Sequence, residues 1–288
     1  MRRAIPFSVI LLATLAVFLG WQPKAGPPAQ TIAPGVMLDH LEVGRLAAPT
    51  AAELISWLVP LWDHPPLNAT IDHTTGAVRP GQPGWRLDVS KTLAVLLSAG
   101  PGQEVPPVLQ TVEPRWPAEA LQNLSTPLAS FQTTITGDAN RVYNVELATS
   151  LLNNTLVLPS QVFSFNAVAG PYETSRGYRE APVIVDNRYE MGAGGGVCQL
   201  SSTLYQAVQA LGLTVVERHG HTLPVTYIKT GQDATVAGSL DFRFRNDLIT
   251  PLVIKASRQG DILAVVLLGR KDEAKSVPSL ASPAPATP

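Results

Sequence analysis

The sequence contains a single cysteine in 288 residues, and few of its residues are charged. One cysteine excludes an intramolecular disulfide, and it also excludes iron–sulfur clusters and zinc sites built from several cysteines. Lysine and arginine number 21 and aspartate and glutamate 22, so the formal net charge is only −1. A general nucleic-acid-binding protein needs a basic face to neutralise phosphates, and this balance argues against one.

What the sequence does have is apolar character together with many turn-forming residues. Hydrophobic residues make up 45% of the chain, which excludes a protein that is disordered throughout. The 22 glycines and 26 prolines indicate many turns and a β-rich body rather than a helix bundle. A chain of this length accommodates one large domain or two of ordinary size, with a core that needs no disulfides.

Residues 1–25 are expected to be a signal peptide or a membrane anchor. Arg2 and Arg3 precede an almost unbroken apolar run from Ala4 to Trp21, an order typical of an export signal. No clean cleavage motif follows, so the sequence leaves both alternatives open. No cysteine lies near residue 20, which excludes a lipoprotein anchor. We therefore expect an exported protein of the cell envelope, membrane-anchored or secreted, that meets the membrane only through this segment.

Composition divides the remaining chain into two folded regions. Residues 26–35 are predicted to be a linker and residues 271–288 a disordered tail, because both are rich in proline and small residues without hydrophobic periodicity. Between them we expect a small module over residues 36–117 and a larger domain over residues 128–270. Prolines 114, 117 and 127 mark the boundary between these two regions.

The module over residues 36–117 is predicted to be α+β. Thr50 is the expected N-cap of its first helix, and Asp88 or Ser90 that of its second. Short strands are expected around these helices. His64 and His73 are isolated in the sequence, and we expect them to be surface or turn residues.

The domain over residues 128–270 is predicted to be mainly antiparallel β with two principal helices, so the fold class is α+β. Phe131, Thr133 and Ile135 alternate as on one strand face. Helical periodicity covers residues 140–152, and a second amphipathic helix begins at Cys198. One side of this second helix is apolar, comprising Leu200, Leu204, Ala207, Val208 and Leu211. Short strands are expected from residue 213 to residue 269, one of them over residues 225–228.

The strongest chemical signal is the segment GAGGGVCQLSSTLY, residues 192–205. Cys198 opens the predicted helix, whose N-terminal partial charge and free amides favour a thiolate, so we expect a lowered thiol pKa. The amides from Gly195 to Cys198 are candidates for an oxyanion hole. Three successive glycines before the cysteine have no evident use in core packing, which favours a functional role.

A nucleophilic cysteine requires a base, and the segment ERHGHTLP, residues 217–224, supplies two histidines. His219 and His221 are two residues apart. Asp233 is a candidate to orient the histidine, with Asp241 and Glu217 as alternatives, and Arg218 is a candidate to hold a substrate carboxylate. The residues alone leave two other interpretations open, a buried structural cysteine and a metal site formed by Cys198 with both histidines. No recognised metal-binding spacing supports the second, and we predict no cofactor or metal.

Five segments together resemble the VanW domain family. They are NRVYNVELATSLLNNTLVLPSQVFSFNAVAGPY, GYREAPVI, GGGVCQLSSTLYQAV, ERHGHTLPVTYIKTGQDATV and DFRFRN. The similarity as a whole extends over residues 130–270. The region before them more weakly resembles a peptidoglycan-binding module. The sequence departs from the usual pattern at Pro159-Ser160-Gln161 and at Gln199-Leu200-Ser201-Ser202-Thr203, and neither departure changes the predicted nucleophile or base.

The resemblance implies an exported bacterial cell-wall protein of a family associated with vancomycin resistance. It implies an L,D-transpeptidase-like reaction on peptidoglycan stem peptides, with Cys198 as nucleophile and His221 as base. Asp233 remains the candidate that orients this histidine. The residues assigned to substrate and oxyanion contacts are Gly194, Gly195, Gly196, Gln199, Ser201, Tyr205, Arg218 and His219. Water as acceptor gives an L,D-carboxypeptidase. The alternative function is a non-catalytic peptidoglycan-binding or glycopeptide-resistance accessory protein, in which the cysteine packs inside.

Overall fold

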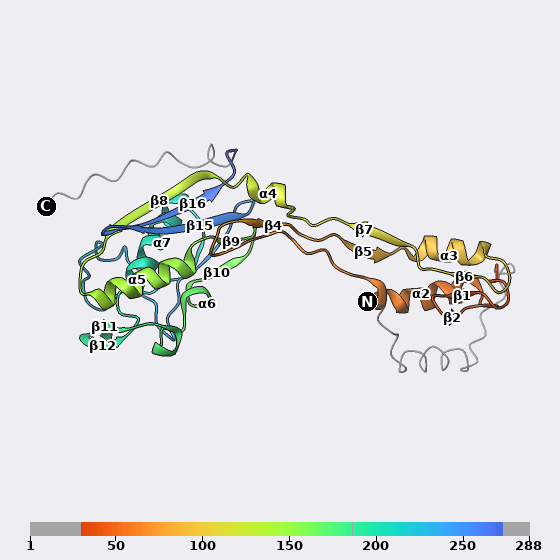
Figure 1. Ribbon diagram of the computed structural model, residues 1–288, viewed down its shortest axis with the longest axis horizontal. Coiled ribbons are helices and arrows are strands. Elements are labelled where there is room, and N and C mark those ends of the chain that lie inside the picture. The colour runs from red at the N-terminus through yellow and green to blue at the C-terminus, as the bar shows by residue number, and fades with distance from the viewer. Residues whose placement is uncertain (1–29, 186, 273–288) are drawn as a thin grey trace. The chain divides into compact units, whose positions relative to one another are not determined.

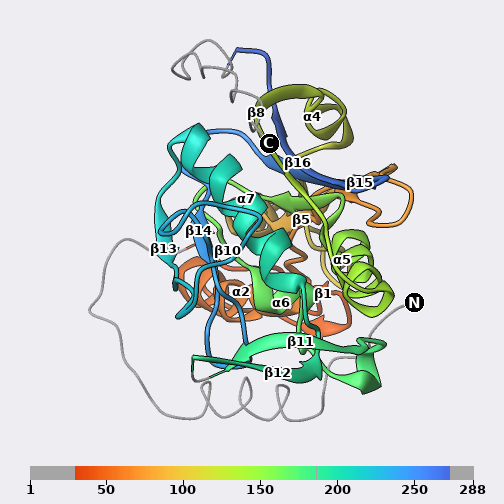
Figure 2. The ribbon, with the colours of Figure 1, turned by 90° about the vertical axis from the view of Figure 1, so that its left-hand side faces the viewer.

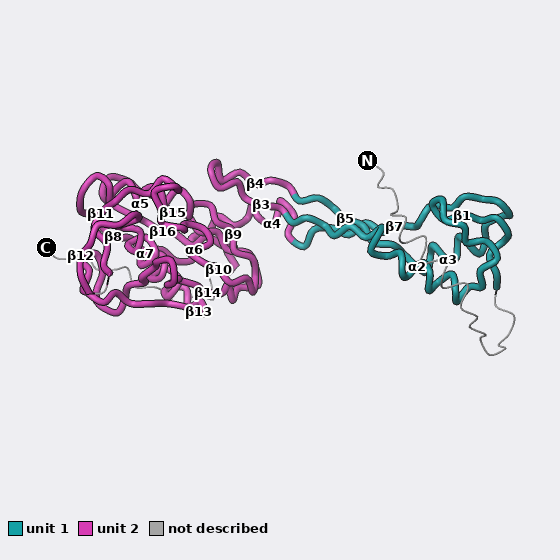
Figure 3. Tube along the Cα trace, turned by 90° about the horizontal axis from the view of Figure 1, so that it is seen from below, with its two compact units in different colours: residues 1–68, 81–115 teal, residues 69–80, 116–288 magenta. Residues whose placement is uncertain are grey.

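The computed structural model describes residues 30–185 and 187–272, and it divides them into two compact units (Figure 3). Unit 1 comprises residues 30–68 and 81–115, and unit 2 comprises residues 69–80 and 116–272. The predicted signal or anchor, part of the predicted linker and nearly all of the predicted tail lie outside the described residues. Within the described residues, no helix combines the length and apolar character needed to cross a membrane.

Unit 1 is a small α+β unit built around two helices. Its elements are β1 (Met37–Leu38), β2 (Leu41–Glu42), α2 (Ala48–Trp62), β5 (Gly84–Leu87), α3 (Val89–Ser98), β6 (Glu104–Val105) and β7 (Leu109–Val112). Strand β1 pairs antiparallel with β2 and parallel with β6, and β5 pairs antiparallel with β7. The core lies between the helices and these short strands, and it includes Leu38, Ile55 and Leu96.

The structure tests the predicted caps of the two helices in unit 1 and the predicted linker before it. Asp88 caps α3, because its carboxylate accepts a hydrogen bond from the Lys91 amide at 2.9 Å. Thr50 does not cap α2, which begins two residues earlier with Pro49 in its first turn, where the fixed φ of proline suits a helix start. Residues 30–35 are not a linker, since Ile32 is buried in the core and its backbone exchanges hydrogen bonds with Arg45 and Leu46, just before α2.

Unit 2 is organised by an antiparallel sheet with the strand order β8 (Thr126–Thr134), β16 (Ile262–Gly269), β15 (Leu252–Gln259) and β9 (Thr155–Val157). Helices α5 (Ala139–Leu152) and α7 (Val197–Leu211) pack together on one face (Figures 1 and 2). Along β15, Leu252 and Ile254 join the core under these helices, whereas Val253 faces the opposite side. This arrangement confirms the predicted α+β class and the two principal helices.

The opposite face of the sheet is covered in part by α4 (Ala118–Gln122) and the hairpin β3 (Thr70–Ile71) with β4 (Val78–Arg79). Ala69 packs with Leu121, Leu124 and Val253 in a small separate cluster. This apolar contact explains why residues 69–80 belong to unit 2, although the sequence places them inside the first module. The chain passes between the units for the third and last time after Arg115, near the start of the proline-marked boundary.

Two smaller sheets lie in unit 2 beside the main sheet and its helices. Strands β10 (Val162–Ser164), β14 (Arg243–Arg245) and β13 (Val215–Glu217) pair antiparallel, and β11 (Glu180–Val185) forms a hairpin with β12 (Arg188–Ala193). Short turns of helix lie at α6 (Phe165–Ala169) and η1 (Thr174–Arg176). The strand expected over residues 225–228 is absent, because this segment lies in an irregular loop that Arg218 holds through the carbonyls of Gly231 and Asp233.

Candidate functional site

The glycines before Cys198 fit closely against their neighbours. Gly194 and Gly196 have φ values of 84° and 102°, in the left-handed region that favours glycine. Glycine is required at position 195 for a different reason, because a Cβ there would lie 2.6 Å from the carbonyl oxygen of Pro182 in β11. The expectation that these glycines serve no packing purpose is therefore wrong. Their presence alone does not identify a catalytic turn.

Cys198 lies in the first turn of α7, as the sequence predicts, but its thiol is not predisposed to ionise. The residue is half-buried, and Sγ donates a hydrogen bond to the carbonyl of Val236 at 3.3 Å. Burial raises the pKa of the thiol, and the negative charge of Asp233 acts in the same direction, while Arg141 opposes them. The predicted lowering of this pKa is wrong, because the cost of desolvating a thiolate exceeds the help from the helix N-terminus.

His221 and Asp233 form a buried pair. Nδ1 of His221 lies 2.5 Å from Oδ2 of Asp233, and each side chain is only 6% exposed. The His221 backbone amide donates to the same oxygen at 2.6 Å. Because a carboxylate accepts, Nδ1 carries the proton and Nε2 is left for another partner. Burial acts to raise the pKa of Asp233, but the hydrogen bonds from His221 outweigh it and hold this pKa below its usual value.

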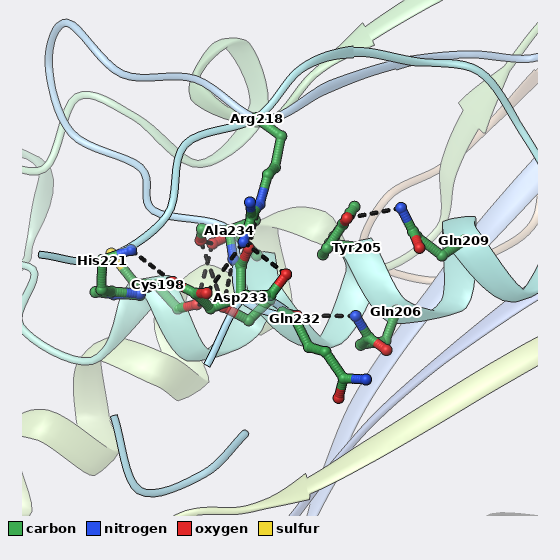
Figure 4. A network of polar contacts seen from close by, with 12 residues as sticks. Cys198, Tyr205, Gln206, Gln209, Arg218, His221, Gln232, Asp233 and Ala234 are labelled. Carbon is green, nitrogen blue, oxygen red and sulfur yellow. Dashed lines mark hydrogen bonds and ion pairs between the residues drawn. The ribbon is translucent and has the colours of Figure 1, made fainter. Parts of the chain in front are cut away.

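A four-residue segment, residues 233–236, joins this pair to the start of α7 (Figure 4). Asp233 at one end holds His221, and the carbonyl of Val236 at the other end accepts from Cys198. Between them the Ala234 amide donates to Ser202 Oγ at 2.9 Å. The segment therefore fixes cysteine and histidine to one short piece of backbone.

The other predicted polar residues already have protein partners. Arg218 donates to the carbonyl of Asp233 at 2.6 Å and to its carboxylate at 3.1 Å, so it clamps this loop and is not a free anchor for a substrate carboxylate. His219 lies 3.0 Å from Glu217, a different carboxylate from the partner of His221. Asp241 accepts from Ser164 and from the Asn166 amide and does not orient either histidine.

Three residues predicted to contact substrate lie in the interior. Gln199 is fully buried and bonds Arg141, Thr133 Oγ1 and the Thr134 carbonyl. Ser201 is fully buried and donates to the carbonyl of Ala234 at 2.5 Å. The hydroxyl of Tyr205 accepts from Gln209 at 2.6 Å. These side chains hold α7 in place, and nothing exposes them to a ligand.

The backbone amides expected to form an oxyanion hole are partly available. Val197 donates to the carbonyl of Gly194 at 3.1 Å and is occupied. The amides of Gly195, Gly196 and Cys198 donate to no other residue within the described ranges. Amides without acceptors at a helix start can bind a developing negative charge.

Several residues of the site have no individual signal in the sequence. Tyr172 and Tyr227 lie within electrostatic reach of Cys198, and burial raises the pKa of both hydroxyls. Asn144 is buried and bonds the backbone of Arg179 and the carbonyl of Gly195. Arg141 and Asn144 are one helical turn apart on α5, a spacing that places both on one face, but only the fold shows that this face meets the glycines.

A cavity of about 670 Å³ lies elsewhere in unit 2. It is lined by His73, Thr74, Ser150, Leu151, Asn153, Ala167 and Val168. His73, expected to be a surface or turn residue, lines this hollow and approaches the Asn153 carbonyl at 3.4 Å. Neither Cys198 nor His221 lines it, so we place the candidate site at the start of α7. Among residues 30–185 and 187–272, no three His, Cys, Asp or Glu side chains group as metal ligands do.

Comparison with known proteins assigns residues 140–268 to a family model described as VanW like protein. The chain is 37% identical to the uncharacterized protein YoaR of Bacillus subtilis over 211 residues, 70% of this chain and 68% of the relative. It is 31% identical to the vancomycin B-type resistance protein VanW of Enterococcus faecalis over 114 residues, 38% of this chain and 42% of the relative. No solved structure matches the chain significantly.

Proposed function

The chain belongs to the family of VanW-like proteins, and we propose that it is an exported cell-wall protein that transfers acyl groups between peptidoglycan stem peptides. One relative carries the name of a vancomycin resistance protein, which supports a role in the cell wall. The apolar run after Arg2 and Arg3 supports export.

The observation that carries the proposed chemistry is the link between Cys198 and the His221–Asp233 pair through residues 233–236. A cysteine, a histidine and a carboxylate that orients the ring are the parts of a cysteine acyltransferase. Since Nδ1 of His221 faces Asp233, its Nε2 is the atom that takes the thiol proton. This requires Cys198 to leave its hydrogen bond with the Val236 carbonyl when substrate binds.

In the proposed reaction, Cys198 loses its proton to His221 and its sulfur attacks the carbonyl carbon of the third residue of a donor stem. The amides of Gly195, Gly196 and Cys198 stabilise the oxyanion. The C–N bond breaks, the terminal D-residue leaves as an amine with the proton from His221, and a thioester remains. An acceptor amine then attacks the thioester, gives its proton to His221, and releases the thiol with a new amide bond.

The raised pKa of Cys198 defines the resting state in this proposal. The thiol is neutral at pH 7, because its pKa lies above the usual value. His221 therefore acts as a general base during the attack, and the resting protein contains no preformed thiolate–imidazolium ion pair. Substrate binding that excludes water protects the thioester from hydrolysis.

The test is incubation of the purified full-length chain with disaccharide tetrapeptides, followed by mass spectrometry of the products. We expect release of the terminal D-residue and cross-linked dimers from the native chain, and neither product from Cys198→Ala. His221→Ala is expected to reduce the rate by about 10²–10⁴-fold. The matched variant His219→Ala removes an imidazole two residues away and is expected to retain most of the rate. Equal product from native chain and Cys198→Ala contradicts the proposal.

A second candidate function is a non-catalytic protein that binds the same peptides, and the hydrogen bond of the Cys198 thiol to Val236 favours it. A half-buried thiol with a raised pKa is compatible with a packing role as well as with a nucleophile that is inactive until substrate binds. The two functions differ in one measurement. A binder retains its affinity for tetrapeptides in Cys198→Ala and releases no D-residue in either form.

A further inference from the structure

The guanidinium of Arg141 is fixed beside the residues that flank Cys198. Arg141 lies in the first turn of α5, and a Cβ on Gly196 would stand 2.8 Å from its Cγ, so its stem covers the glycine turn. Its Nη2 donates to Oε1 of Gln199 at 2.8 Å, and its Nη1 donates to the Thr136 carbonyl at 2.6 Å. Contacts on both sides of Cys198 thus hold one cation at the start of α7.

Within the described residues, Arg141 contacts no carboxylate in an ion pair, although the negative charge of Asp138 acts on it and the Tyr227 ring centre lies 5.9 Å from its guanidinium carbon. The ion pairs within the described ranges do not include Arg141, and both of its hydrogen-bond acceptors are neutral oxygens. Arg218, by contrast, contacts the Asp233 carboxylate. Arg141 is half-buried, and burial lowers its pKa, although a guanidinium stays charged at neutral pH. A partly buried charge that no carboxylate contacts costs stability, and this cost calls for a compensating role.

We infer that Arg141 is a positioning residue whose charge stabilises the negative charge that develops at Cys198, first as thiolate and then in the tetrahedral intermediate. The thiolate part rests on the contacts of Arg141 with Gly196 and Gln199, on either side of Cys198, whereas the part that concerns the intermediate rests on the proposed function. Arg218, expected from the sequence to hold a substrate carboxylate, pairs instead with the Asp233 carboxylate.

The groups that act on the Cys198 thiol come from several elements. They are Arg141 from α5, Tyr172 from the segment after α6, Tyr227 and Asp233 from the loop after β13, and His221 through its bond to Asp233. Asp233 raises the pKa of the thiol and Arg141 lowers it. Both tyrosine hydroxyls are neutral at working pH, since burial raises their pKa. Arg141 is therefore the permanent positive charge in this set.

The experiment measures the thiol pKa from the pH dependence of iodoacetamide alkylation of the full-length chain, in which Cys198 is the single cysteine. We expect Arg141→Gln to raise the thiol pKa by about one unit, so that the alkylation rate at a fixed pH below the pKa falls about tenfold. Arg141→Lys keeps the charge and is expected to stay near the native value. The matched control Arg179→Gln removes a guanidinium that stacks on Tyr143 and is expected to change nothing.

A folded Arg141→Gln protein with a native thiol pKa overturns the inference. If Arg141→Gln does not fold, Arg141→Lys decides: a native thiol pKa supports the charge role, and a pKa raised by a full unit overturns it. The readout is independent of turnover. A native chain that transfers no stem peptide, with a shifted thiol pKa in Arg141→Gln, refutes the proposed function and leaves the thiolate part of this inference intact.

Discussion

The carboxylate of Asp233 accepts two hydrogen bonds from His221, one from the backbone amide at 2.6 Å and one from ring Nδ1 at 2.5 Å. This double contact fixes both the position of the residue and the orientation of its ring. Arg218 adds a third contact to the other carboxylate oxygen at 3.1 Å. A single aspartate therefore determines where the proposed base stands.

Asp233→Asn tests this contact through the acid sensitivity of the fold. The folded pKa of Asp233 lies below its unfolded value of 3.8. The carboxylate thus stabilises the fold fully above about pH 4, and this contribution is lost as the pH falls through the lower folded value. We expect the variant to lose about 1–3 kcal/mol at pH 7 and less at pH 2.5. Urea titrations at both pH values measure the difference, and an equal loss at both would contradict the assignment.

The Cys198 thiol is expected to react slowly in the folded protein. Because burial raises its pKa, alkylation by iodoacetamide should increase mainly above the ordinary thiol range, near pH 8.5, and unfolding in guanidinium should accelerate it at pH 7.5. The fold is also expected to become less stable as the pH rises past about 8.5. The reason is that the thiol pKa in the folded protein lies above its value in the unfolded chain. A half-maximal rate below pH 8 would show instead that the site stabilises the thiolate.

Gly195→Ala tests the packing of the glycine turn. The new methyl group would stand 2.6 Å from the Pro182 carbonyl oxygen, and backbone atoms cannot move aside as a flexible side chain can. We expect a loss of about 1–3 kcal/mol, measured as a melting point lowered by several degrees. Gly238→Ala is the control, because no atom lies within 4 Å of its added methyl group. Equal melting points of the two variants would refute the close fit.

Asn144→Ala tests the tie between α5 and the glycine turn. The substitution leaves the Arg179 amide, the Arg179 carbonyl and the Gly195 carbonyl without their present partner. Buried polar groups left unpaired are costly, so we expect a loss of about 3 kcal/mol in urea unfolding. Asn140→Ala removes one exposed hydrogen bond, to the Glu180 carbonyl, and should cost less than about 1 kcal/mol. A smaller loss in Asn144→Ala than in Asn140→Ala would contradict the assignment.

The sequence predicts those features of the fold that depend on periodicity. The apolar side of α7 is buried, as the spacing of Leu200 and Leu204 predicts. An amphipathic helix buries its apolar side against whatever core the fold provides, so this prediction does not depend on knowing the tertiary structure. The N-cap of α2 is missed, because a helical proline at position 49 allows an earlier start than Thr50 suggests. Ile32 is missed for another reason, since one apolar residue among prolines carries no periodic signal.

For the site, the sequence identifies the residue types but not their energetics. The pairing of His221 with Asp233 is anticipated and present. The pKa of Cys198 is predicted with the wrong sign, because a helix N-terminus is visible in a sequence and the desolvation around a sulfur is not. Arg141 and Tyr227 escape detection since they reach the site from α5 and from an irregular loop, and such approaches depend on tertiary structure.

The discontinuous make-up of both units has a consequence for biosynthesis and for protein engineering. As the chain leaves the ribosome, residues 30–68 emerge before residues 81–115, with which they form unit 1. Residues 69–80 cannot pack on the main sheet of unit 2 until β16 has been synthesised and has completed that sheet. Neither unit can be separated by cutting one peptide bond. A truncation that begins at residue 116 deprives Leu121 and Val253 of Ala69, so a soluble fragment of unit 2 must carry residues 69–80 through a designed connection.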